Sequence, residues 1–524
     1  MSRTLLLGGR VHSASRPAVT AMLVDGERVA WLGSDDEAQD FRSDADEVLE
    51  LEGALVTPAF VDAHVHATST GLALEGLDLT GAGSLAEVLD RVERFARARR
   101  GVGILLGHGW DETAWPDLRA PTRGELDRAT FGGVAYLTRV DVHSAVASSA
   151  LLAAVPGLPG LAGYHDSGLL TRDAHHAARA AAMGAVTAAQ RAAAQRATRT
   201  RCAELGIGLL HELGGPQVSS AEDFTAMLAL AATEPGPEVV GYWGELGGAE
   251  RAGELGALGA AGDVFADGSI GSHTAGLRTV YCDDKASAGL EYLDAEQVRD
   301  HVVACTRAGL QAGFHVIGDG ALDTVLAGFG EAAARLGADR VRAARHRLEH
   351  VEMPDAAHLE QMARLGVHAS VQPMFDALWG GEDGMYERRL GPERAARMNP
   401  FAAMAAAGIP LAFGSDSPVT PLGPWEAVRA AAFHRTPSAR LPVPVAFEAH
   451  TRGGWRAAGV DDAGMLSPGA LASYAVWADE QPGDRTLPDL APGTAAPRCL
   501  RTAVRGATVW SADGAPDHTE SWPW

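Results

Sequence analysis

Short apolar runs alternate with longer helix-prone segments through the middle of the chain, from about residue 56 to residue 465. Eight of these runs have the length and composition of buried strands: 56–61, 134–138, 208–211, 263–266, 311–315, 347–350, 369–372 and 411–414. Most are followed by a stretch rich in Ala, Arg and Glu that is long enough for a helix. Eight strands that alternate with helices predict an α/β fold, a (β/α)8 barrel of the TIM type. A doubly wound open sheet is the alternative that this pattern allows.

The two ends of the chain have a different pattern. The first 55 residues and the last part of the chain read as short strands separated by Gly-, Asp- and Pro-rich turns. We therefore expect a small β-sandwich built from both termini. The expected boundaries are 1–56 and 465–524 for the sandwich and 57–464 for the barrel, with an insertion near 151–183.

Composition and charge exclude several classes of protein. The net charge of −23 argues against a surface for nucleic acid or for an anionic membrane. The four cysteines are far apart and form no CxxC pair, so neither a disulfide framework nor a cysteine-zinc site is expected. We find neither a signal peptide nor an apolar run of about 18 residues that would span a membrane. A cytoplasmic globular protein is the expectation.

Polar side chains of metal-ligand type stand at the ends of four predicted strands. His64 and His66 are two residues apart on the first strand, so both imidazoles point the same way. His315, His350 and Asp416 end the fifth, sixth and eighth strands. Each residue alone is more simply explained as an ordinary core or surface residue. Together, at one end of a barrel, imidazoles and a carboxylate predict a site for a zinc-like ion.

The order of these residues, and several segments around them, resemble the amidohydrolase superfamily. The segments are TPAFVDAHVH (57–66), GHGWDETAW (107–115), FADGSIGSHTAG (265–276), FHVIGDGALD (314–323), RLEHVE (347–352) and FGSDSPVTPLGPW (413–425). They are similar to the amidohydrolase 3 branch, which includes N-substituted formamide deformylases. The resemblance implies a metal-dependent hydrolase that acts on carbon–nitrogen bonds other than peptide bonds. It also implies the barrel and the terminal sandwich.

The chain departs from this family at the position of a metal-bridging lysine. Many members carry a carboxylated lysine on the fourth strand, and relatives place it four residues before the motif that matches Asp267-Gly268. That position is Asp263 here, and Lys285 is the only lysine in the chain. Either Asp263 supplies the bridging carboxylate directly, or the site holds one ion. We favour one firmly held ion, most simply Zn, with Asp263 as a ligand to a second.

The resemblance also suggests roles for the remaining site residues. Asp416 is expected to bind metal and to act as the general base, because a carboxylate beside a metal-activated water can accept its proton and return it to the leaving amine. His143, His211, Trp110 and Trp379 are candidates for substrate binding, although packing explains each of them equally well.

Two other functions remain open on the sequence. The same site serves hydrolysis of an ester, a lactone or an aminated ring. A barrel of this type can also bind a small molecule without metal, since fold alone does not establish activity. In each case the expected partner is a small-molecule substrate or ligand, with no nucleic acid and no membrane. The sequence does not distinguish a monomer from a homodimer.

Overall fold

The structure is a computed structural model, and it describes residues 2–13, 16, 18–99, 103–112, 115–139, 144–478 and 487–512. The chain divides into two compact units. Unit 1 comprises Met1–His66 and Arg199–Trp524, and unit 2 comprises Ala67–Thr198. Across the described residues, no helix combines the length and the apolar character that crossing a bilayer requires.

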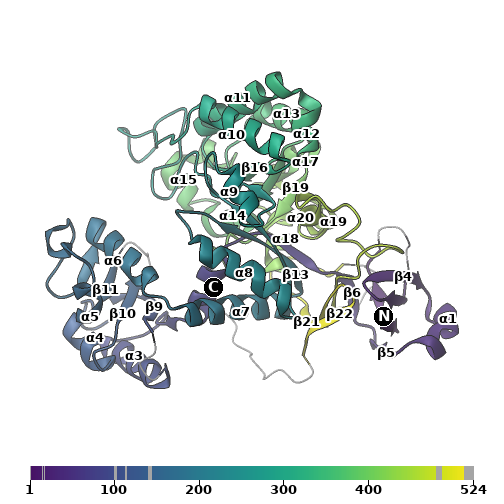
Figure 1. Cartoon of the computed structure of the whole chain (residues 1–524), viewed down its shortest axis with the longest axis horizontal. Helices are drawn as coiled ribbons and strands as arrows, with labels where there is room; N and C mark the ends of the chain where they lie inside the picture. The colour runs from purple at the N-terminus through teal and green to yellow at the C-terminus, as the bar shows by residue number, and fades with distance from the viewer. Residues whose placement is uncertain are drawn as a thin grey trace. The chain divides into compact units, whose positions relative to one another are not determined.

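Unit 1 contains a sheet of eight parallel strands (Figure 1). In spatial order they are β7 (Phe60–Val65), β13 (Ile207–Gly214), β14 (Glu238–Trp243), β15 (Gly259–Ala260), β16 (Gln311–Val316), β17 (Arg347–His350), β18 (His368–Val371) and β19 (Leu411–Phe413). The two edges meet through a parallel bridge between Val65 and Ser417. The sheet therefore closes on itself, and the predicted (β/α)8 barrel is confirmed.

Helices connect most of the barrel strands. They are α8 (Ala221–Thr233), α9 (Ala249–Glu254), α10 (Ala295–Ala308), α11 (Asp319–Leu336), α12 (Ala338–Ala343), α13 (Ala356–Leu365), α14 (Pro373–Trp379), α15 (Met385–Leu390), α16 (Pro392–Ala395), α17 (Phe401–Ala406), α18 (Pro424–Ala432), α19 (Val443–Ala449) and α20 (Arg452–Ala457). Local sequence determines the ends of α10. Asp294 caps its N-terminus by accepting a hydrogen bond from the Gln297 amide at 2.8 Å. The helix ends at Gly309, whose φ of 72° is a conformation that glycine adopts without strain.

Two of the predicted barrel strands differ from the structure. Segment 134–138 overlaps β10 (Ala135–Arg139), which belongs to the sheet of unit 2. The barrel strand that the prediction missed is β14, and β13, predicted as the third strand, is the second. Segment 263–266 lies beyond β15, which ends at Ala260, although Phe265 still forms a parallel bridge to His315 of β16. An apolar run indicates that a strand is buried, but its pairing depends on segments far away in the chain.

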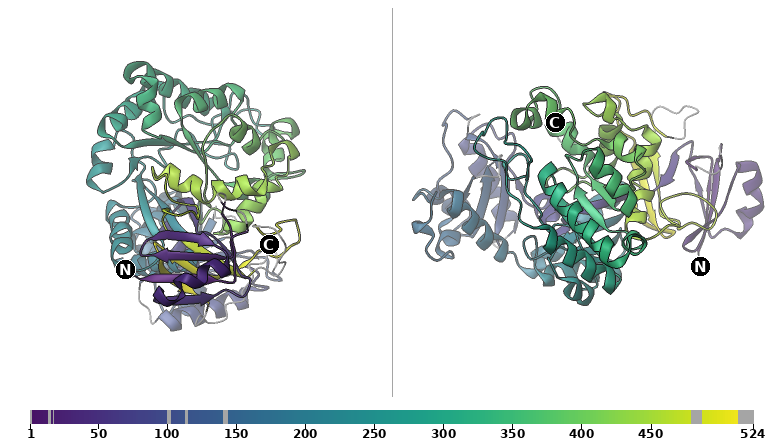
Figure 2. Two further views of the ribbon diagram at one scale, coloured as in Figure 1. Left: turned by 90° about the vertical axis from the view of Figure 1, so that its right-hand side faces the viewer. Right: turned by 90° about the horizontal axis from the view of Figure 1, so that it is seen from above.

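The chain ends form two further sheets in unit 1. One has the order β4 (Arg28–Gly33), β3 (Ala21–Asp25), β1 (Arg3–Leu7), β5 (Glu47–Glu50), and its strands lie side by side, in purple, in the left view of Figure 2. The other has the order β2 (Arg10–Val11), β6 (Leu55–Pro58), β20 (Tyr474–Ala478), β21 (Arg498–Val504), β22 (Ala507–Ser511). Met22, Val24, Val56 and Val476, from both sheets, share one buried cluster. The sandwich built from both termini is confirmed, while its boundaries at 56 and 465 stay predictions.

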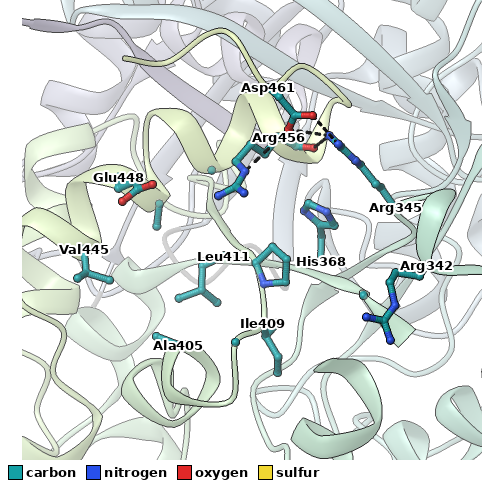
Figure 3. Close-up of a pocket in the computed structure, with 15 residues that line it drawn as sticks. Arg342, Arg345, His368, Ala405, Ile409, Leu411, Val445, Glu448, Arg456 and Asp461 are labelled. Atoms are coloured by element: carbon teal, nitrogen blue, oxygen red, sulfur yellow. Dashed lines mark hydrogen bonds and ion pairs between the residues drawn. The ribbon is translucent and has the colours of Figure 1, made fainter. Parts of the chain in front are cut away.

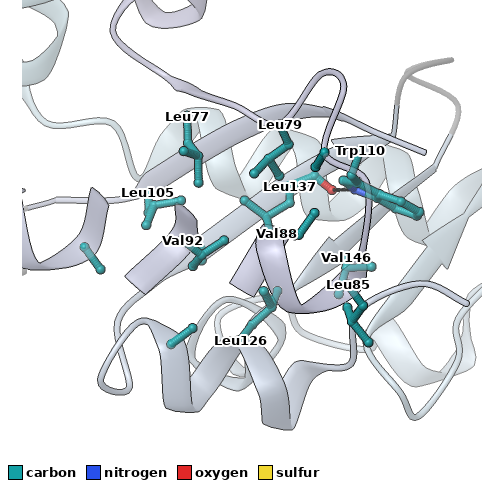
Figure 4. Packing of buried hydrophobic residues seen from close by; sticks show 14 of the residues in the cluster. Leu77, Leu79, Leu85, Val88, Val92, Leu105, Trp110, Leu126, Leu137 and Val146 are labelled. Carbon is teal, nitrogen blue, oxygen red and sulfur yellow. Dashed lines mark hydrogen bonds between the residues drawn. The ribbon is translucent and has the colours of Figure 1, made fainter. Parts of the chain in front are cut away.

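Unit 2 has its own sheet and its own core. Its elements are α2 (Ala67–Leu74), β8 (Leu77–Asp78), α3 (Leu85–Arg99), β9 (Leu105–Trp110), α4 (Arg123–Ala129), β10, β11 (Ser144–Ala147), α5 (Ser149–Ala153), β12 (Leu169–Thr171), α6 (Arg172–Gly184) and the start of α7 (Ala188–Glu204). Leu79, Val88, Leu126 and Leu137 are fully buried in this core (Figure 4). The expected insertion, 151–183, lies within unit 2.

Candidate metal centre

Six side chains with metal-binding atoms converge in unit 1, where the strands of the barrel end. They are His64, His66, Asp263, His315, His350 and Asp416. Their ligand atoms form three overlapping groups of three, and within each group these atoms lie within 4.8 Å of one another. All of the side chains except His66 belong to buried residues. The structure therefore brings together the whole ligand set expected from the sequence, at the end of the barrel where such folds carry their chemistry.

The rings of His64 and His66 are held through their Nδ1 atoms. His64 Nδ1 lies 2.9 Å from Glu349 Oε2, and His66 Nδ1 lies 2.9 Å from the carbonyl oxygen of Leu213. Both partners are acceptors, so each Nδ1 carries a proton and each Nε2 faces the centre. Both Nε2 atoms lie 3.2 Å from the same oxygen, Oδ1 of Asp416. Burial lowers the pKa of His66, but the hydrogen bond to Asp416 and the nearby carboxylate charges outweigh it and raise that pKa to about 9, so an ion that binds here would displace a proton from Nε2.

His350 and His315 approach the centre with different ring nitrogens. His350 Nδ1 lies 2.7 Å from Gln372 Oε1, which leaves Nε2 for the centre. His315 Nε2 lies 3.3 Å from the carbonyl oxygen of Gly268, and its Nδ1 lies 3.8 Å from Asp263 Oδ1. Four imidazoles thus offer one nitrogen each, while a neighbouring acceptor holds the other.

Asp263 lies between the two pairs of imidazoles. It shares one ligand group with His64 and His66 and another with His315 and His350. Its Oδ2 is 3.3 Å from His66 Nε2, and its Oδ1 is 3.8 Å from His64 Nε2. This short side chain reaches the centre because it follows β15 by three residues, so the main chain itself approaches. The carboxylate therefore contributes to both groups of candidate ligand atoms.

A glycine permits this approach of the main chain. A Cβ added to Gly244, which follows β14, would lie 3.0 Å from the carbonyl carbon of Asp263. That distance is shorter than ordinary van der Waals contact, so a larger residue would push Asp263 away. The position of Asp263 therefore depends on the glycine at position 244.

Asp416 is positioned by the closure of the barrel. Its amide donates to the His64 carbonyl at 2.7 Å, and its φ of 55° turns the chain sharply beyond β19. Asp62 Oδ1 accepts the amides of Ser415, at 2.9 Å, and of His64, at 3.2 Å. Gly414 allows the contact, because an added Cβ would lie 2.5 Å from the His64 nitrogen. The ends of β7 and β19 are thereby fixed to each other beside the ligand atoms.

The charges of the cluster fit a cation. Burial alone would raise the pKa of the Asp416 carboxyl, but the charge of His64 outweighs it and holds that pKa well below its usual range. Burial, followed by the charge of His315, lowers the pKa of His350 to about 4. His64 Nε2 and Asp263 Oδ1 are buried and have no hydrogen-bond partner among the described residues. An unpaired buried polar atom costs about 1–3 kcal/mol. Imidazole and carboxylate are ligands that zinc-type ions prefer, so the residues present fit a divalent metal.

A fully buried ion pair supports this cluster inside the barrel. Arg347 Nε donates to Glu349 Oε1 at 2.6 Å, and the guanidinium lies 4.4 Å from the centre of the Tyr242 ring. Arg347 also donates to His211 Nδ1, at 2.9 Å. Glu349 in turn holds His64 through the 2.9 Å contact described above. Sequence reasoning missed both members of the pair, although they are two residues apart on β17 and Glu349 immediately precedes His350.

A cavity of about 700 Å³ is lined by Asp263 and His315. Its apolar lining includes Phe265, Leu246, Tyr292 and Leu293. The other acidic residue that lines it is Glu245, whose Oε2 accepts a hydrogen bond from Trp243 Nε1 at 2.7 Å. All of its lining residues are among those described, and none of them is Arg or Lys. The cavity therefore combines an apolar surface with acidic groups.

The structure places the four candidate substrate residues differently. His211 is fully buried in the barrel, where it pairs with Arg347. Trp379 packs on Phe375, at 4.5 Å between ring centres, and Phe375 in turn stacks on His350. Trp110 is buried in unit 2, where Nε1 donates to the Leu137 carbonyl at 2.9 Å. His143 lies outside the described residues. None of the three described residues, His211, Trp379 and Trp110, lines the 700 Å³ cavity.

Known proteins resemble this chain over nearly its whole length. Protein LONG AFTER FAR-RED 3 of Arabidopsis thaliana is 28% identical, covering 90% of this chain and 86% of its own. The N-substituted formamide deformylase of Arthrobacter pascens is 23% identical, covering 80% of each chain. The crystal structure of an uncharacterized metal-dependent hydrolase from Pyrococcus furiosus is 25% identical, with a TM-score of 0.77 over 90% of this chain and 98% of its own.

A model of the amidohydrolase family matches residues 47–510. This range includes the barrel and all six side chains of the candidate metal centre. The chain belongs to the amidohydrolase family and is a hydrolase.

Proposed function

We propose that this protein is a metal-dependent amidohydrolase that cleaves an amide- or formamide-type C–N bond of a small molecule. The proposal rests on four imidazoles and two carboxylates that converge in one place. Two of their buried atoms, His64 Nε2 and Asp263 Oδ1, lack a hydrogen-bond partner among the described residues. Similarity to an N-substituted formamide deformylase supports a C–N bond as the target.

The centre would hold one or two divalent ions, and zinc is our proposal for their identity. His64 and His66 with Asp263 are suited to one ion, and His315 and His350 with Asp263 to a second. Such an ion lowers the pKa of water and polarises a carbonyl group. This ligand set favours Asp263 as the bridging carboxylate, in place of the carboxylated lysine of other family members.

Asp416 is the residue that we propose as general base. Burial raises the pKa of its carboxyl, but without metal the charge of His64 outweighs burial and holds that pKa well below its usual range; a bound cation would favour the ionised form in the same way. One of its oxygens lies within 3.2 Å of both His64 Nε2 and His66 Nε2. It can take the proton of the attacking water and deliver it to the departing nitrogen, which leaves as a neutral amine. Glu349 and Gln372 accept hydrogen bonds from the Nδ1 atoms of His64 and His350, and these bonds would hold both rings in place during the transfer.

The cavity suggests the type of substrate group that the site accepts. Its apolar lining suits an aliphatic or aromatic group, whereas Glu245 and Asp263 disfavour a negatively charged one. We propose that the part of the substrate in this cavity is neutral or cationic.

Metal analysis paired with a substrate panel tests the proposal. We expect about one to two equivalents of zinc per chain, and turnover of N-substituted formamides or amides that a chelator abolishes and added zinc restores. Esters, lactones and aminated rings form the comparison arm of the panel. Protein that contains well under one equivalent of any divalent metal and hydrolyses none of these compounds would overturn the proposal.

A further inference from the structure

A second cavity of unit 1 lies where barrel strands begin. Its volume is about 460 Å³, and its lining includes His368, the first residue of β18, and Leu411, the first residue of β19 (Figure 3). The metal-ligand residues stand where strands end, so this cavity is at the opposite end of the same barrel. No residue lines both this cavity and the one beside Asp263.

The walls of this cavity are of two kinds. The apolar lining includes Ala405, Ile409, Leu411 and Val445. The charged lining includes three arginines, of which Arg345 and Arg456 lie together and Arg342 lies apart from them: Arg342, Arg345 and Arg456. Figure 3 shows the guanidinium groups of Arg345 and Arg456 near Asp461, with the apolar residues below them. An amphipathic cavity of this size matches a small organic molecule.

The arginines are only partly neutralised. Arg345 makes two hydrogen bonds to Asp461, at 2.6 and 3.1 Å, and is satisfied by them. Arg456 reaches Asp461 only through Nε, at 3.9 Å, and its side chain makes no hydrogen bond to any described residue. The lining also contains Glu448, but this carboxylate pairs with Arg452 at 3.6 Å, so Asp461 is the lining carboxylate that remains to balance three guanidinium groups. The lining therefore carries an excess of positive charge.

A buried imidazole without a full set of partners lines the same cavity. His368 is 6% exposed, and its Nδ1 has no hydrogen-bond partner among the described residues. Burial, followed by the charge of Arg347, Arg345 and Arg456, lowers the pKa of His368 to about 3. The ring is therefore neutral at physiological pH and can donate one N–H without adding charge.

We propose that this cavity binds a small organic monocarboxylate. Its carboxylate would pair with Arg456 and accept a hydrogen bond from His368, and its apolar part would pack against Ile409, Leu411 and Val445. The excess positive charge beside Arg456 matches a carboxylate. The apolar wall distinguishes such a ligand from inorganic phosphate, which has no surface to bury there. The site is independent of the metal centre and of the reaction proposed for it.

A soaked crystal gives the position of the ligand. The probe is 4-bromobenzoate, because the anomalous signal of bromine locates it. We expect a bromine peak in the cavity, with the carboxylate between Arg456 and His368. A carboxylate can also bind at a metal, so a peak only at the metal centre, or no peak, would overturn the proposal.

Calorimetry on the metal-loaded protein tests the chemistry. Benzoate should bind, and Arg456→Gln should weaken it about tenfold, because a charge-assisted hydrogen bond is lost. Arg364→Gln is the matched control, since it removes an exposed arginine of α13 that does not line the cavity. Benzamide, the neutral analogue, should bind about tenfold more weakly than benzoate. Equal affinities for benzoate and benzamide, or equal affinities of the two variants, would contradict the proposal.

Discussion

The two ends of the barrel carry opposite chemistry on the same strands. Strands β17, β18 and β19 begin near a cavity with three arginines and end near a cluster of imidazoles and carboxylates. The ligand cluster is almost fully buried, whereas the guanidinium groups at the other end are partly exposed: the side chain of Arg456 is 47% exposed. The types of residue alone therefore do not show which end of the barrel holds the candidate metal centre. The direction of the strands and the burial of the polar atoms distinguish the two ends.

Between the two ends lies the buried pair of Arg347 and Glu349. Glu349 contacts the candidate metal ligand His64, and the charge of Arg347 contributes to the lowered pKa of His368 at the arginine-lined cavity. The pair therefore lies between the proposed cation site and the proposed carboxylate site. Four substitutions test this difference between the two ends of the barrel.

The largest effect is expected at the candidate metal centre. Asp416→Asn should lower kcat about a thousandfold, because an amide cannot accept the proton of the attacking water. Metal content should remain high, since the four imidazoles and Asp263 are intact. The control is Asp376→Asn, a buried aspartate beside His434 that lies outside the ligand cluster. Near-normal turnover of Asp416→Asn would refute the assigned role.

Breaking the central pair should mainly affect stability. Arg347→Met leaves Glu349 buried without its cation, so the free energy of unfolding should fall by about 3–5 kcal/mol. Urea denaturation of the metal-free protein measures the change without a contribution from bound ion. Arg335→Met removes an exposed pair with Asp300 and should cost about 1 kcal/mol at most. Equal losses in the two variants would show that the buried pair has no special importance.

Loosening a single imidazole should produce an intermediate effect. Gln372→Met removes the acceptor that orients His350, and metal affinity should fall about ten- to a hundredfold while the fold is retained. Competition with a chromophoric chelator gives the affinity. Gln361→Met provides the comparison, because that side chain bonds to the Leu326 carbonyl away from the centre. Unchanged affinity in Gln372→Met would remove Gln372 from the supporting residues.

The smallest effect concerns substrate charge. Glu245→Gln should reduce the preference for a cationic over a neutral amide about fivefold in kcat/KM, which corresponds to about 1 kcal/mol for a partly solvated charge pair. Glu250→Gln, on the exposed face of α9, should leave this ratio unchanged. If Glu245→Gln keeps the wild-type ratio, the acidic lining does not select the substrate.

Residues at strand ends were the most predictable part of the site. His64 and His66 lie on one strand and point the same way. His315, His350 and Asp416 each follow an apolar run. The local sequence pattern was therefore enough to predict that these side chains lie near one another. Their supporting residues were not predictable in this way. Glu349 and Gln372 are ordinary polar residues in sequence, and their roles depend on contacts with side chains from other strands.

In the fold, too, features that depend on local sequence were predictable, and features that depend on long-range pairing were not. The eightfold alternation and the terminal sandwich were correctly predicted, because periodicity and turn residues are local signals. The assignment of 134–138 to the barrel failed because β10 and β14 are both short and apolar. Only the long-range pairing of β14 with β13 distinguishes them. The sequence pattern also placed His211 at the end of a predicted strand, where a ligand would be expected. In the structure β13 continues to Gly214, and His211 accepts a hydrogen bond from Arg347 inside the barrel.

The position of Asp263 has a consequence for how the proposed centre assembles. A carbamate on lysine forms only when dissolved carbon dioxide reacts with the free amine, so such sites depend on bicarbonate for their maturation. Here the carboxylate oxygens of Asp263, three residues beyond the end of β15, would take the place of the carbamate oxygens. Loading of this protein with zinc should therefore proceed equally well in buffer stripped of carbon dioxide.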